Sequence, residues 1–331
     1  MSSKRSNPSN RFAGGRQAAV FVASVLDRYR LHPTRLLRVN ESHNSTWRIE
    51  DARGRRFVLK IHRPTERIDA IRSEMQWLDA LSSETDLLVP RPIRNRDGEL
   101  ITVLDDGRPC RMMTWVHGVR RGRSMRTKHL ESLGELMARL HLHAMQFKRP
   151  RGFYRPTFGR ERLLVRLTTL RTSHKQRAIT RAQLNVFERA TKLGLAAMRR
   201  LGTGREVFGL IHGDLCYGNQ IYDRTGRAGA IDFEAGGFGY FLEDIVEPFA
   251  LAQHVPRIDK LCEDVLRGYR TVRALPDEHA RLIPAFVTVS IVTTCGYIAG
   301  EPTRRAEIGD FAKYAQKHLP RVFSAATRRE R

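Results

Sequence analysis

Short runs of alternating apolar and polar residues dominate the first third of the chain and predict a small, mostly antiparallel sheet. Strands are expected at residues 36–39, 47–49, 56–61, 93–94, 100–104 and 111–116. Apolar residues at helical spacing predict one helix over residues 18–29 and another over 65–82. This part reads as one lobe, a sheet accompanied by two helices.

Helical periodicity dominates the rest of the chain. Helices are expected at residues 129–143, 160–172, 181–201, 243–254, 258–273, 279–298 and 303–318. Between them, residues 210–211, 220–222 and 228–231 read as short strands, the last two joined by a turn at 223–226. The expected fold class is therefore α+β and bilobal, with a small antiparallel β lobe (18–116) and a larger mainly helical lobe (117–331).

Three polar residues in the β unit of the second lobe are candidates for chemistry. Asp214 follows the first short strand, Asn219 lies five residues later, and Asp232 follows the hairpin directly. The pattern thus gathers two carboxylates and an amide at one edge. Phosphoryl transfer uses such a set: an aspartate accepts the proton of the attacking hydroxyl, and an amide oxygen and a second carboxylate hold Mg²⁺.

The stretch 212–219 reads H-G-D-L-C-Y-G-N, and D-F-E follows at 232–234. Protein kinases carry H-R-D-L-x-x-x-N followed by D-F-G, with the same Asp-to-Asn spacing. The whole string resembles the aminoglycoside phosphotransferase family. That resemblance implies a protein-kinase-like fold, ATP (or GTP) and Mg²⁺ as cofactors, Asp214 as base, and Asn219 and Asp232 as metal ligands. It also implies that Asp244 braces the catalytic loop.

Lys60 ends the strand F-V-L-K, much like the kinase strand whose lysine pairs with the nucleotide phosphates and a helix glutamate. Glu74 lies on the following predicted helix and is the candidate partner of Lys60. Glu66 is the alternative, but it falls in the first turn, where an acid already favours the helix dipole.

Two further nucleotide contacts are expected in the first lobe. The polar turn at 40–46 would lie over the phosphates, using backbone N–H groups and the hydroxyls of Ser42, Ser45 or Thr46. By resemblance, backbone groups between Met113 and Val116 would bind the adenine.

The composition bears on where the protein is located and on which partners it can bind. No run of about 18 apolar residues indicates a membrane span, and residues 1–17 lack a secretory apolar segment and read as a disordered basic tail. The four cysteines have no C-x-x-C spacing, which favours a reducing cytoplasm. Cys216 is interpreted as a neighbour of the base rather than a nucleophile. The net charge of +24 is spread along the chain, so nucleic-acid binding is not the expected function.

The predicted function is ATP-dependent phosphoryl transfer to a hydroxyl of a small molecule. A bacterial Ser/Thr protein kinase of the stress-response type is the alternative within the class, with a protein as acceptor. Two alternatives from other functional classes also remain: a nucleotide-binding pseudokinase and a basic nucleic-acid-binding protein. The basic charge disfavours a polycationic aminoglycoside as the acceptor.

Overall fold

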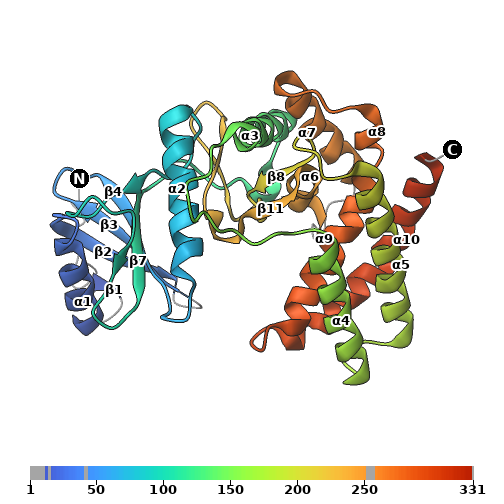
Figure 1. The fold of residues 1–331 in the computed structure, drawn as a ribbon, viewed down its shortest axis with the longest axis horizontal. Helices are drawn as coiled ribbons and strands as arrows, with labels where there is room; N and C mark the ends of the chain where they lie inside the picture. Colours follow the sequence, from blue (N-terminus) through green and yellow to red (C-terminus); the bar gives the residue numbers. More distant parts are fainter. Residues whose placement is uncertain (1–11, 14–15, 41–43, 251–257, 330–331) are drawn as a thin grey trace, which may run out of the picture. The chain divides into compact units, whose positions relative to one another are not determined.

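The computed structural model describes residues 12–13, 16–40, 44–250 and 258–329 of the 331-residue chain, which forms two compact units (Figure 1). The first unit comprises residues 1–117 and 148–154, and the second comprises 118–147 and 155–331. The segment 148–154 thus belongs to the first unit, although its place in the sequence put it in the second lobe.

The first unit is built on one sheet with strand order β1-β2-β3-β4-β7-β5, and β6 pairs with β7. β1 pairs with β2 in parallel, and the other neighbours are antiparallel. The strands are β1 Phe12–Ala13, β2 Pro33–Asn40, β3 Ser45–Asp51, β4 Arg56–Ile61, β5 Pro92–Ile93, β6 Thr102–Val103 and β7 Pro109–Thr114. The predicted antiparallel lobe is confirmed.

The two faces of this sheet are covered by different helices. Helix α1 (Arg16–Asp27) buries Val22, Val25 and Leu26 in one core with Leu59 and Met112 of the sheet. Because successive strand residues point to opposite faces, the residues next to Leu59 and Met112 face the other way. On that side lies α2 (Ile68–Glu84), a helix predicted at 65–82.

The stretch that carries Asp214, Asn219 and Asp232 forms the β part of the second unit. β8 (Phe208–Ile211) pairs with β11 (Gly237–Tyr240), and β9 (Gln220–Tyr222) pairs with β10 (Ala228–Ala230), all antiparallel. Sequence reading had missed β11, because G-F-G-Y carries two glycines that weaken a strand pattern. Its pairing with β8 brings the two ends of the stretch together.

The helices of the second unit are α3 Thr127–Gln146, α4 Arg160–Lys175, α5 Arg181–Leu201, α6 Phe241–Ala250, α7 Ile258–Val272, α8 Asp277–Ala280, α9 Ile283–Gly300 and α10 Ile308–Arg329. One helix was predicted over 279–298, but the chain breaks before α9. Pro284 in the first turn of α9 explains the break, since proline starts a helix readily and cannot donate to the turn before it.

Helix α9 is long and apolar enough to cross a membrane by length and composition, yet 83% of it is buried in the structure. It packs against α4, α5, α6 and α10. A core helix of a helical lobe has these properties, and the confirmed bilobal α+β fold accounts for α9 in this way.

Three sequence predictions touch residues that the structure does not describe. Most of the predicted 1–17 tail lies outside the described residues, but Phe12–Ala13 form β1 and α1 already begins at Arg16. Ser42 also lies outside them, and so do the last residues of the helix predicted at 243–254.

Candidate active site

The catalytic loop places Asp214 beside Asn219. The Asn219 Nδ2 group donates to Asp214 Oδ2 at 2.7 Å and to the Asp214 carbonyl at 2.9 Å. The amide nitrogen is therefore used within the loop, and the amide oxygen Oδ1 is left as the acceptor atom that could serve a cation. The predicted pair is brought together as the five-residue spacing requires.

The tautomer of His212 follows from its two neighbours. Its Nε2 lies 3.0 Å from the Ile231 carbonyl, which can only accept, so Nε2 carries the proton. Its Nδ1 accepts from the Asp214 backbone N–H at 3.3 Å. The buried ring thus ties the residue before Asp232 to the backbone of the proposed base.

Asp244 braces the same loop from α6, as the sequence resemblance implied. Its carboxylate accepts from the backbone N–H groups of His212 at 2.9 Å and Gly213 at 2.8 Å. Its Oδ2 also lies 3.3 Å from His141 Nε2, and His141 Nδ1 lies 3.0 Å from the Tyr269 hydroxyl. Burial raises the pKa of Asp244, but these hydrogen bonds and the neighbouring histidines outweigh it and hold that pKa below its usual value.

Nothing in the sequence linked His141 or its partner Tyr269 to Asp244. The structure shows a buried chain, in which Arg273 donates to the Tyr269 hydroxyl, which contacts His141 and through it Asp244. Helix spacing could place His141 on a buried face, but only the fold brings α3 and α7 to Asp244.

Asp232 stands at a special backbone position. It is exposed, adopts left-handed angles (φ 65°, ψ 67°), and is followed by a single 3-10 turn, Phe233–Ala235. An L-residue rarely holds this conformation without support from its surroundings.

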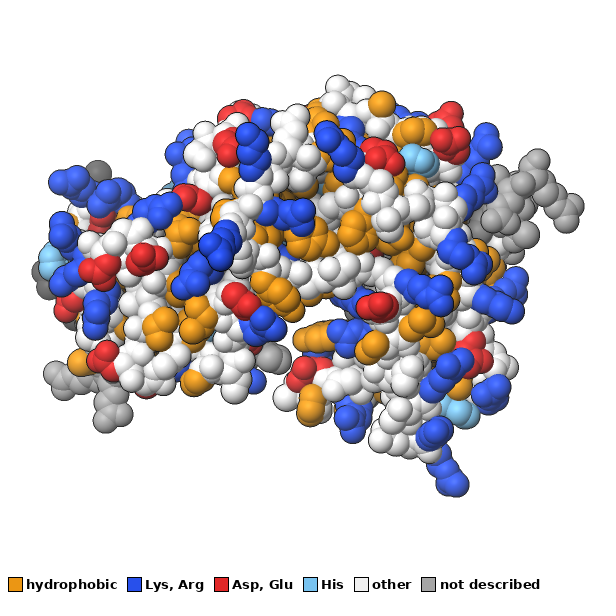
Figure 2. Space-filling model, in the orientation of Figure 1, with side chains coloured by type: hydrophobic (Ala, Val, Ile, Leu, Met, Phe, Trp, Pro, Cys, Tyr) orange, Lys and Arg blue, Asp and Glu red, His pale blue; other side chains and the backbone are white. Residues whose placement is uncertain are grey.

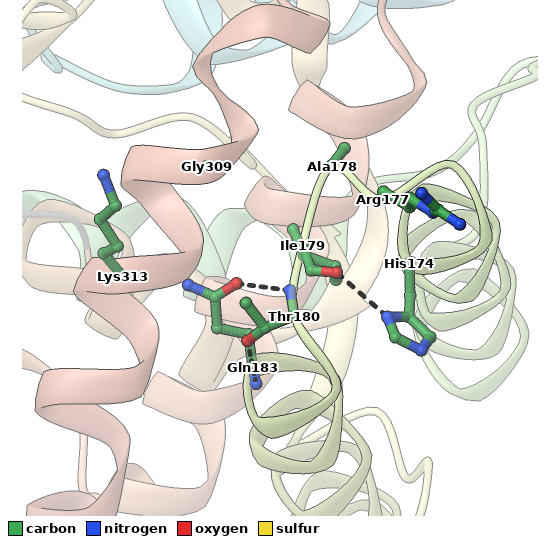
Figure 3. Close-up of a pocket in the computed structure, with 8 residues that line it drawn as sticks. All are labelled: His174, Arg177, Ala178, Ile179, Thr180, Gln183, Gly309 and Lys313. Carbon is green, nitrogen blue, oxygen red and sulfur yellow. Dashed lines mark hydrogen bonds between the residues drawn. The ribbon is translucent and has the colours of Figure 1, made fainter.

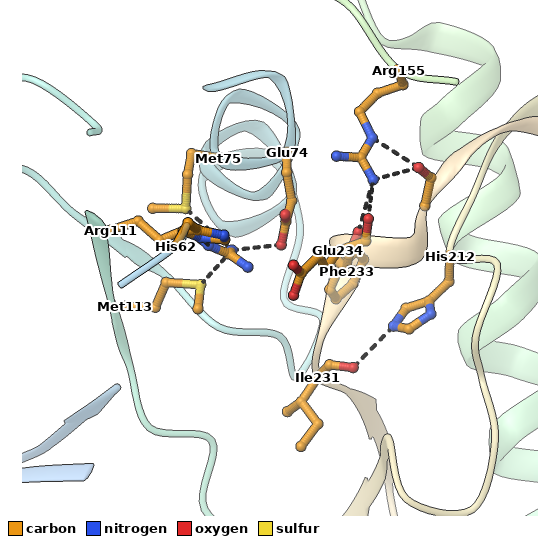
Figure 4. A network of polar contacts seen from close by, with 11 residues as sticks. His62, Glu74, Met75, Arg111, Met113, Arg155, His212, Ile231, Phe233 and Glu234 are labelled. Atoms are coloured by element: carbon orange, nitrogen blue, oxygen red, sulfur yellow. Dashed lines mark hydrogen bonds and ion pairs between the residues drawn. The ribbon is translucent and has the colours of Figure 1, made fainter. Parts of the chain in front are cut away.

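Arg155 supplies that support. Its buried guanidinium donates to the carbonyls of Gly236 at 2.8 Å, Glu234 at 2.6 Å and Phe233 at 3.2 Å (Figure 4). Three carbonyls of one turn are therefore held by a single cation directly after Asp232. Nothing in the sequence spacing predicted this residue, since 77 residues separate it from Asp232.

Burial raises the pKa of Asp214, and the charge of Asp232 raises it further, while His212, Cys216 and Asn219 act in the opposite direction. The Ile231 N–H, directly before Asp232, donates to the Asn219 carbonyl at 3.0 Å, which brings Asp232 next to the loop that carries Asp214. A cation placed there would relieve their repulsion. Burial, followed by the charge of Asp214, raises the pKa of the Cys216 thiol to about 11, so this cysteine is a poor nucleophile.

The donor set fits Mg²⁺. Within the described part of the chain no three His, Cys, Asp or Glu side chains gather as a metal cluster. Mg²⁺ needs no such cluster, since it takes one or two protein oxygens, nucleotide phosphates and waters. The carboxylate of Asp232 and the amide oxygen of Asn219 are ligands of that kind.

Lys60 lies in β4 opposite Thr46 of β3 and Arg111 of β7. Directly opposed residues of antiparallel strands share a face, so these three side chains form a row on the α2 side of the sheet. Thr46 is thus part of a strand rather than of the predicted turn. The row puts Lys60 and Thr46 on one surface, as a phosphate site would need.

Glu74 was predicted to hold Lys60, and the structure reveals another partner. Its Oε1 lies 2.5 Å from Arg111 Nη1, and both side chains are at most 2% exposed (Figure 4). Arg111 Nε also donates to His62 Nε2 at 3.1 Å. Burial, with the charges of Arg111 and Lys60, lowers the pKa of His62 to about 2, so the ring is neutral and can accept. The Lys60–Glu74 contact stays a prediction.

The remaining nucleotide-site candidates lie where the chain leaves the sheet. Met113 is a buried residue of β7, and Val116 follows the strand, partly buried. The segment after β7 is tied back by the Trp115 N–H, which donates to the Arg56 carbonyl at 2.9 Å. Their contact with adenine stays a prediction, as does the role of Ser42.

Two carboxylates near the base were missed by sequence reading. Glu243 and Glu247 lie one turn apart on α6, both partly buried, and burial raises the pKa of each to about 7. The charge of Asp214 contributes to the shift at Glu247, whose Oε2 accepts from the Ser290 hydroxyl at 2.9 Å. The sequence shows that Glu243 and Glu247 are four residues apart, but it does not show which way this face of α6 points.

A cavity of about 410 Å³ lies between the α4–α5 connection and α10 (Figure 3). It is lined by His174, Arg177, Ala178, Ile179, Thr180, Gln183, Gly309 and Lys313. Thr180 and Gln183 cap each other at the start of α5, and the His174 ring contacts the Ile179 carbonyl. None of the candidate catalytic residues lines this cavity, so it is not the active site.

A model of the phosphotransferase enzyme family matches residues 36–281. Amicoumacin kinase of Bacillus subtilis (strain 168) is 25% identical over 201 residues, which cover 57% of this chain and 55% of that protein. Homoserine kinase of Polaromonas naphthalenivorans (strain CJ2) is 26% identical over 203 residues, covering 60% of each. The chain thus spans less than two thirds of the length of either relative.

Solved structures extend the likeness to nearly the whole chain. A microcompartment-associated aminopropanol kinase superposes with a TM-score of 0.78 at 24% identity, covering 93% of this chain and 98% of that one. An amicoumacin kinase in complex with AMP-PNP and Ca²⁺ gives 0.74 at 19% identity, covering 93% and 95%. At these identities the likeness shows the fold, and it confirms the predicted kinase-like architecture.

Proposed function

Because the chain belongs to the phosphotransferase enzyme family, we propose that it transfers the γ-phosphoryl group of ATP to a hydroxyl of a small molecule. The observation that carries this proposal is the geometry of the catalytic loop. Asn219 donates to Asp214, the Ile231 N–H directly before Asp232 donates to the Asn219 carbonyl, and Asp244 accepts two backbone hydrogen bonds of the loop; these contacts support the assignment. Positioning and electrostatics of this kind supply most of the catalysis in phosphoryl transfer.

Each residue has a distinct role in the proposed reaction. Asp214 orients the acceptor hydroxyl and accepts its proton, and its raised pKa makes it a better base than an exposed aspartate. Asn219 and Asp232 would hold Mg²⁺, which supplies charge neutralisation at the phosphates when it is bound. Lys60 adds a positive charge on the α2 side of the sheet, beside the buried Glu74–Arg111 pair.

The acceptor class is supported by the relatives and by the charge distribution. The relatives are kinases named for aminopropanol, homoserine and amicoumacin, all small molecules. Figure 2 shows Lys and Arg side chains spread over the visible surface of both units. A net charge of +24 attracts anionic nucleotides and opposes a polycationic aminoglycoside. A cytoplasmic location is also proposed, since all four cysteines are free thiols.

The test is Mg²⁺-dependent ATP turnover by the purified protein with a panel of small hydroxylated acceptors. Asp214→Asn should lower kcat by on the order of 100-fold or more, the loss expected for a general base. Asp232→Asn should abolish the Mg²⁺-dependent turnover while circular dichroism and thermal unfolding show a folded protein. Wild-type turnover in either variant would refute the corresponding assignment.

A further inference from the structure

Helix α4 carries two partly buried arginines, Arg162 and Arg166, one turn apart. At that spacing their Cβ atoms are about 5–6 Å apart on one face of the helix. The guanidinium carbon of Arg162 lies 3.9 Å from the centroid of the Phe158 ring, and that of Arg166 lies 5.5 Å from the Tyr297 ring. Both guanidinium groups are therefore placed by aromatic rings.

Burial raises the pKa of Glu243 and of Glu247 on α6 and the charge of Arg162 acts against it, but neither glutamate forms an ion pair with Arg162. Within the described part of the chain, neither arginine makes an ion pair or a hydrogen bond, and the Arg166 Nε is buried without a hydrogen-bond partner. Burial lowers the pKa of Arg166, and the charge of Arg162 lowers it further. Elsewhere on the same helix, Arg171 pairs with Glu188 at 2.9 Å. Two adjacent, partly buried like charges cost stability, which is typical of a site that awaits a ligand of opposite charge.

The pair lies on the side of the proposed base. The guanidinium of Arg162 stacks on the Phe158 ring, and this ring packs against Gly213, the residue before Asp214. A Cβ atom placed on Gly213 would lie 3.4 Å from the Phe158 ring. Phe158 also packs with Ile211 and Phe241 in one buried cluster. The charges of Arg162 and Asp214 both act on Glu247, with opposite sign. Arg162 is thus one aromatic ring away from the catalytic loop.

We propose that Arg162 and Arg166 bind a carboxylate carried by the acceptor, which is therefore a hydroxy acid or hydroxy amino acid. This inference rests on the proposed phosphotransferase activity and names the acceptor of that same site. A guanidinium matches a carboxylate in a planar, two-point hydrogen-bonded pair, and stacking on a ring holds its orientation before the ligand arrives. Glu247, on which the charges of both Arg162 and Asp214 act, is a candidate to meet a cationic group on the same molecule.

The experiment uses matched acceptors that differ only by a carboxylate. L-Homoserine is compared with 3-amino-1-propanol, and L-threonine with 1-amino-2-propanol, by kcat/KM in the presence of Mg·ATP. A two-point charged contact predicts a preference of about 10- to 100-fold for the carboxylated member of at least one pair. Arg162→Gln should reduce the preference towards 1 by lowering kcat/KM for the carboxylated member of the pair.

Matched variants separate binding from folding. Arg162→Lys keeps the charge but loses the planar fork, so it should retain only part of the preference. Arg171→Gln, on the same helix but about 13 Å further along at 1.5 Å per residue, should keep the full preference. Arg166→Gln should raise the Tm of the ligand-free protein, because it relieves a like-charge pair. A purely structural arginine would lower the Tm on removal.

The outcomes distinguish this inference from the proposed activity. Equal kcat/KM within both pairs would overturn the carboxylate site and leave the phosphotransferase standing. A preference for glycerol 3-phosphate over glycerol, with none within the amino acid pairs, would overturn the carboxylate in favour of a phosphate ester. No turnover of any acceptor, and no binding of homoserine or threonine by calorimetry with Mg·AMP-PNP present, would overturn both proposals.

Discussion

Arg155 offers the sharpest test of how the fold prepares the metal site. The substitution Arg155→Met keeps the length and apolar stem of the side chain and removes every donor. Three carbonyls, of Phe233, Glu234 and Gly236, then lose the cation that holds the turn after Asp232. The arginine side chain is 6% exposed in the native structure, so water cannot simply replace it.

The magnitude follows from the contacts. A hydrogen bond from a charged donor is worth about 1.5–3 kcal/mol, and breaking a buried charged network typically costs about 3–5 kcal/mol because its members are not additive. For a unit of this size, 1 kcal/mol shifts Tm by roughly 2–4 °C, so a fall of about 6–20 °C is expected. Residues that orient metal ligands typically contribute 10- to 100-fold to metal affinity. The apparent affinity for Mg²⁺ should fall by about that factor.

The assay pairs thermal unfolding with Mg²⁺ titration of turnover at 25 °C, where the variant remains folded. Arg267→Gln is the matched control, since Arg267 also bonds two acidic side chains but is 56% exposed. Its loss should cost less than about 1 kcal/mol and leave the Mg²⁺ dependence unchanged. An Arg155→Met protein with a lowered Tm but the wild-type Mg²⁺ dependence would show that Arg155 supports the fold and not the position of Asp232.

The other expectations concern buried charges. Burial raises the pKa of Asp214 in the native state, so the ionised carboxylate destabilises the fold at neutral pH, and Asp214→Asn should raise Tm at pH 7. In the wild-type protein, kcat/KM should fall as the pH drops through this raised pKa, because the base becomes protonated. Asp244→Asn should lower Tm, because an amide NH₂ would face backbone N–H donors of the catalytic loop. Glu74→Gln should cost about 3–5 kcal/mol in a urea titration, since it leaves Arg111 buried without its anion. Cys216→Ala should keep turnover, and the wild-type thiol should react slowly with a disulfide reagent at pH 8.

The local geometry around the candidate catalytic residues could be predicted from sequence because it depends on short sequence separations. Asp214 and Asn219 lie in one loop, and their five-residue spacing alone brings the amide to the carboxylate. Asp232 follows a strand that pairs within the same hairpin. Lys60 was found through its place at the end of an apolar strand. Short-range periodicity and turn chemistry suffice for residues of this kind.

The residues that support the site could not be predicted from sequence, because their contacts lie far away in the sequence. Arg155 reaches its carbonyls across about 80 positions, and His141 reaches Asp244 across 103. In the sequence, Arg111 is a single charged residue within an apolar strand. This pattern does not indicate which residue would pair with it. Its pairing with Glu74 depends on how α2 lies on the sheet, which sequence periodicity does not specify.

The charge of this protein acts on two length scales that favour the same kind of acceptor. Beyond about 8 Å, salt screens individual charges, and the net +24 acts as a diffuse field that draws in anions such as ATP. At short range, the charges of Asp214 and Arg162 both act on Glu247, so groups of both signs can discriminate between charge patterns on one small molecule. A polycation would be repelled by the field, and a neutral sugar would leave the arginine pair unused. A hydroxy amino acid carries no net charge and is therefore not repelled by the field, and under the proposal its carboxylate meets the arginines while its ammonium meets the glutamate.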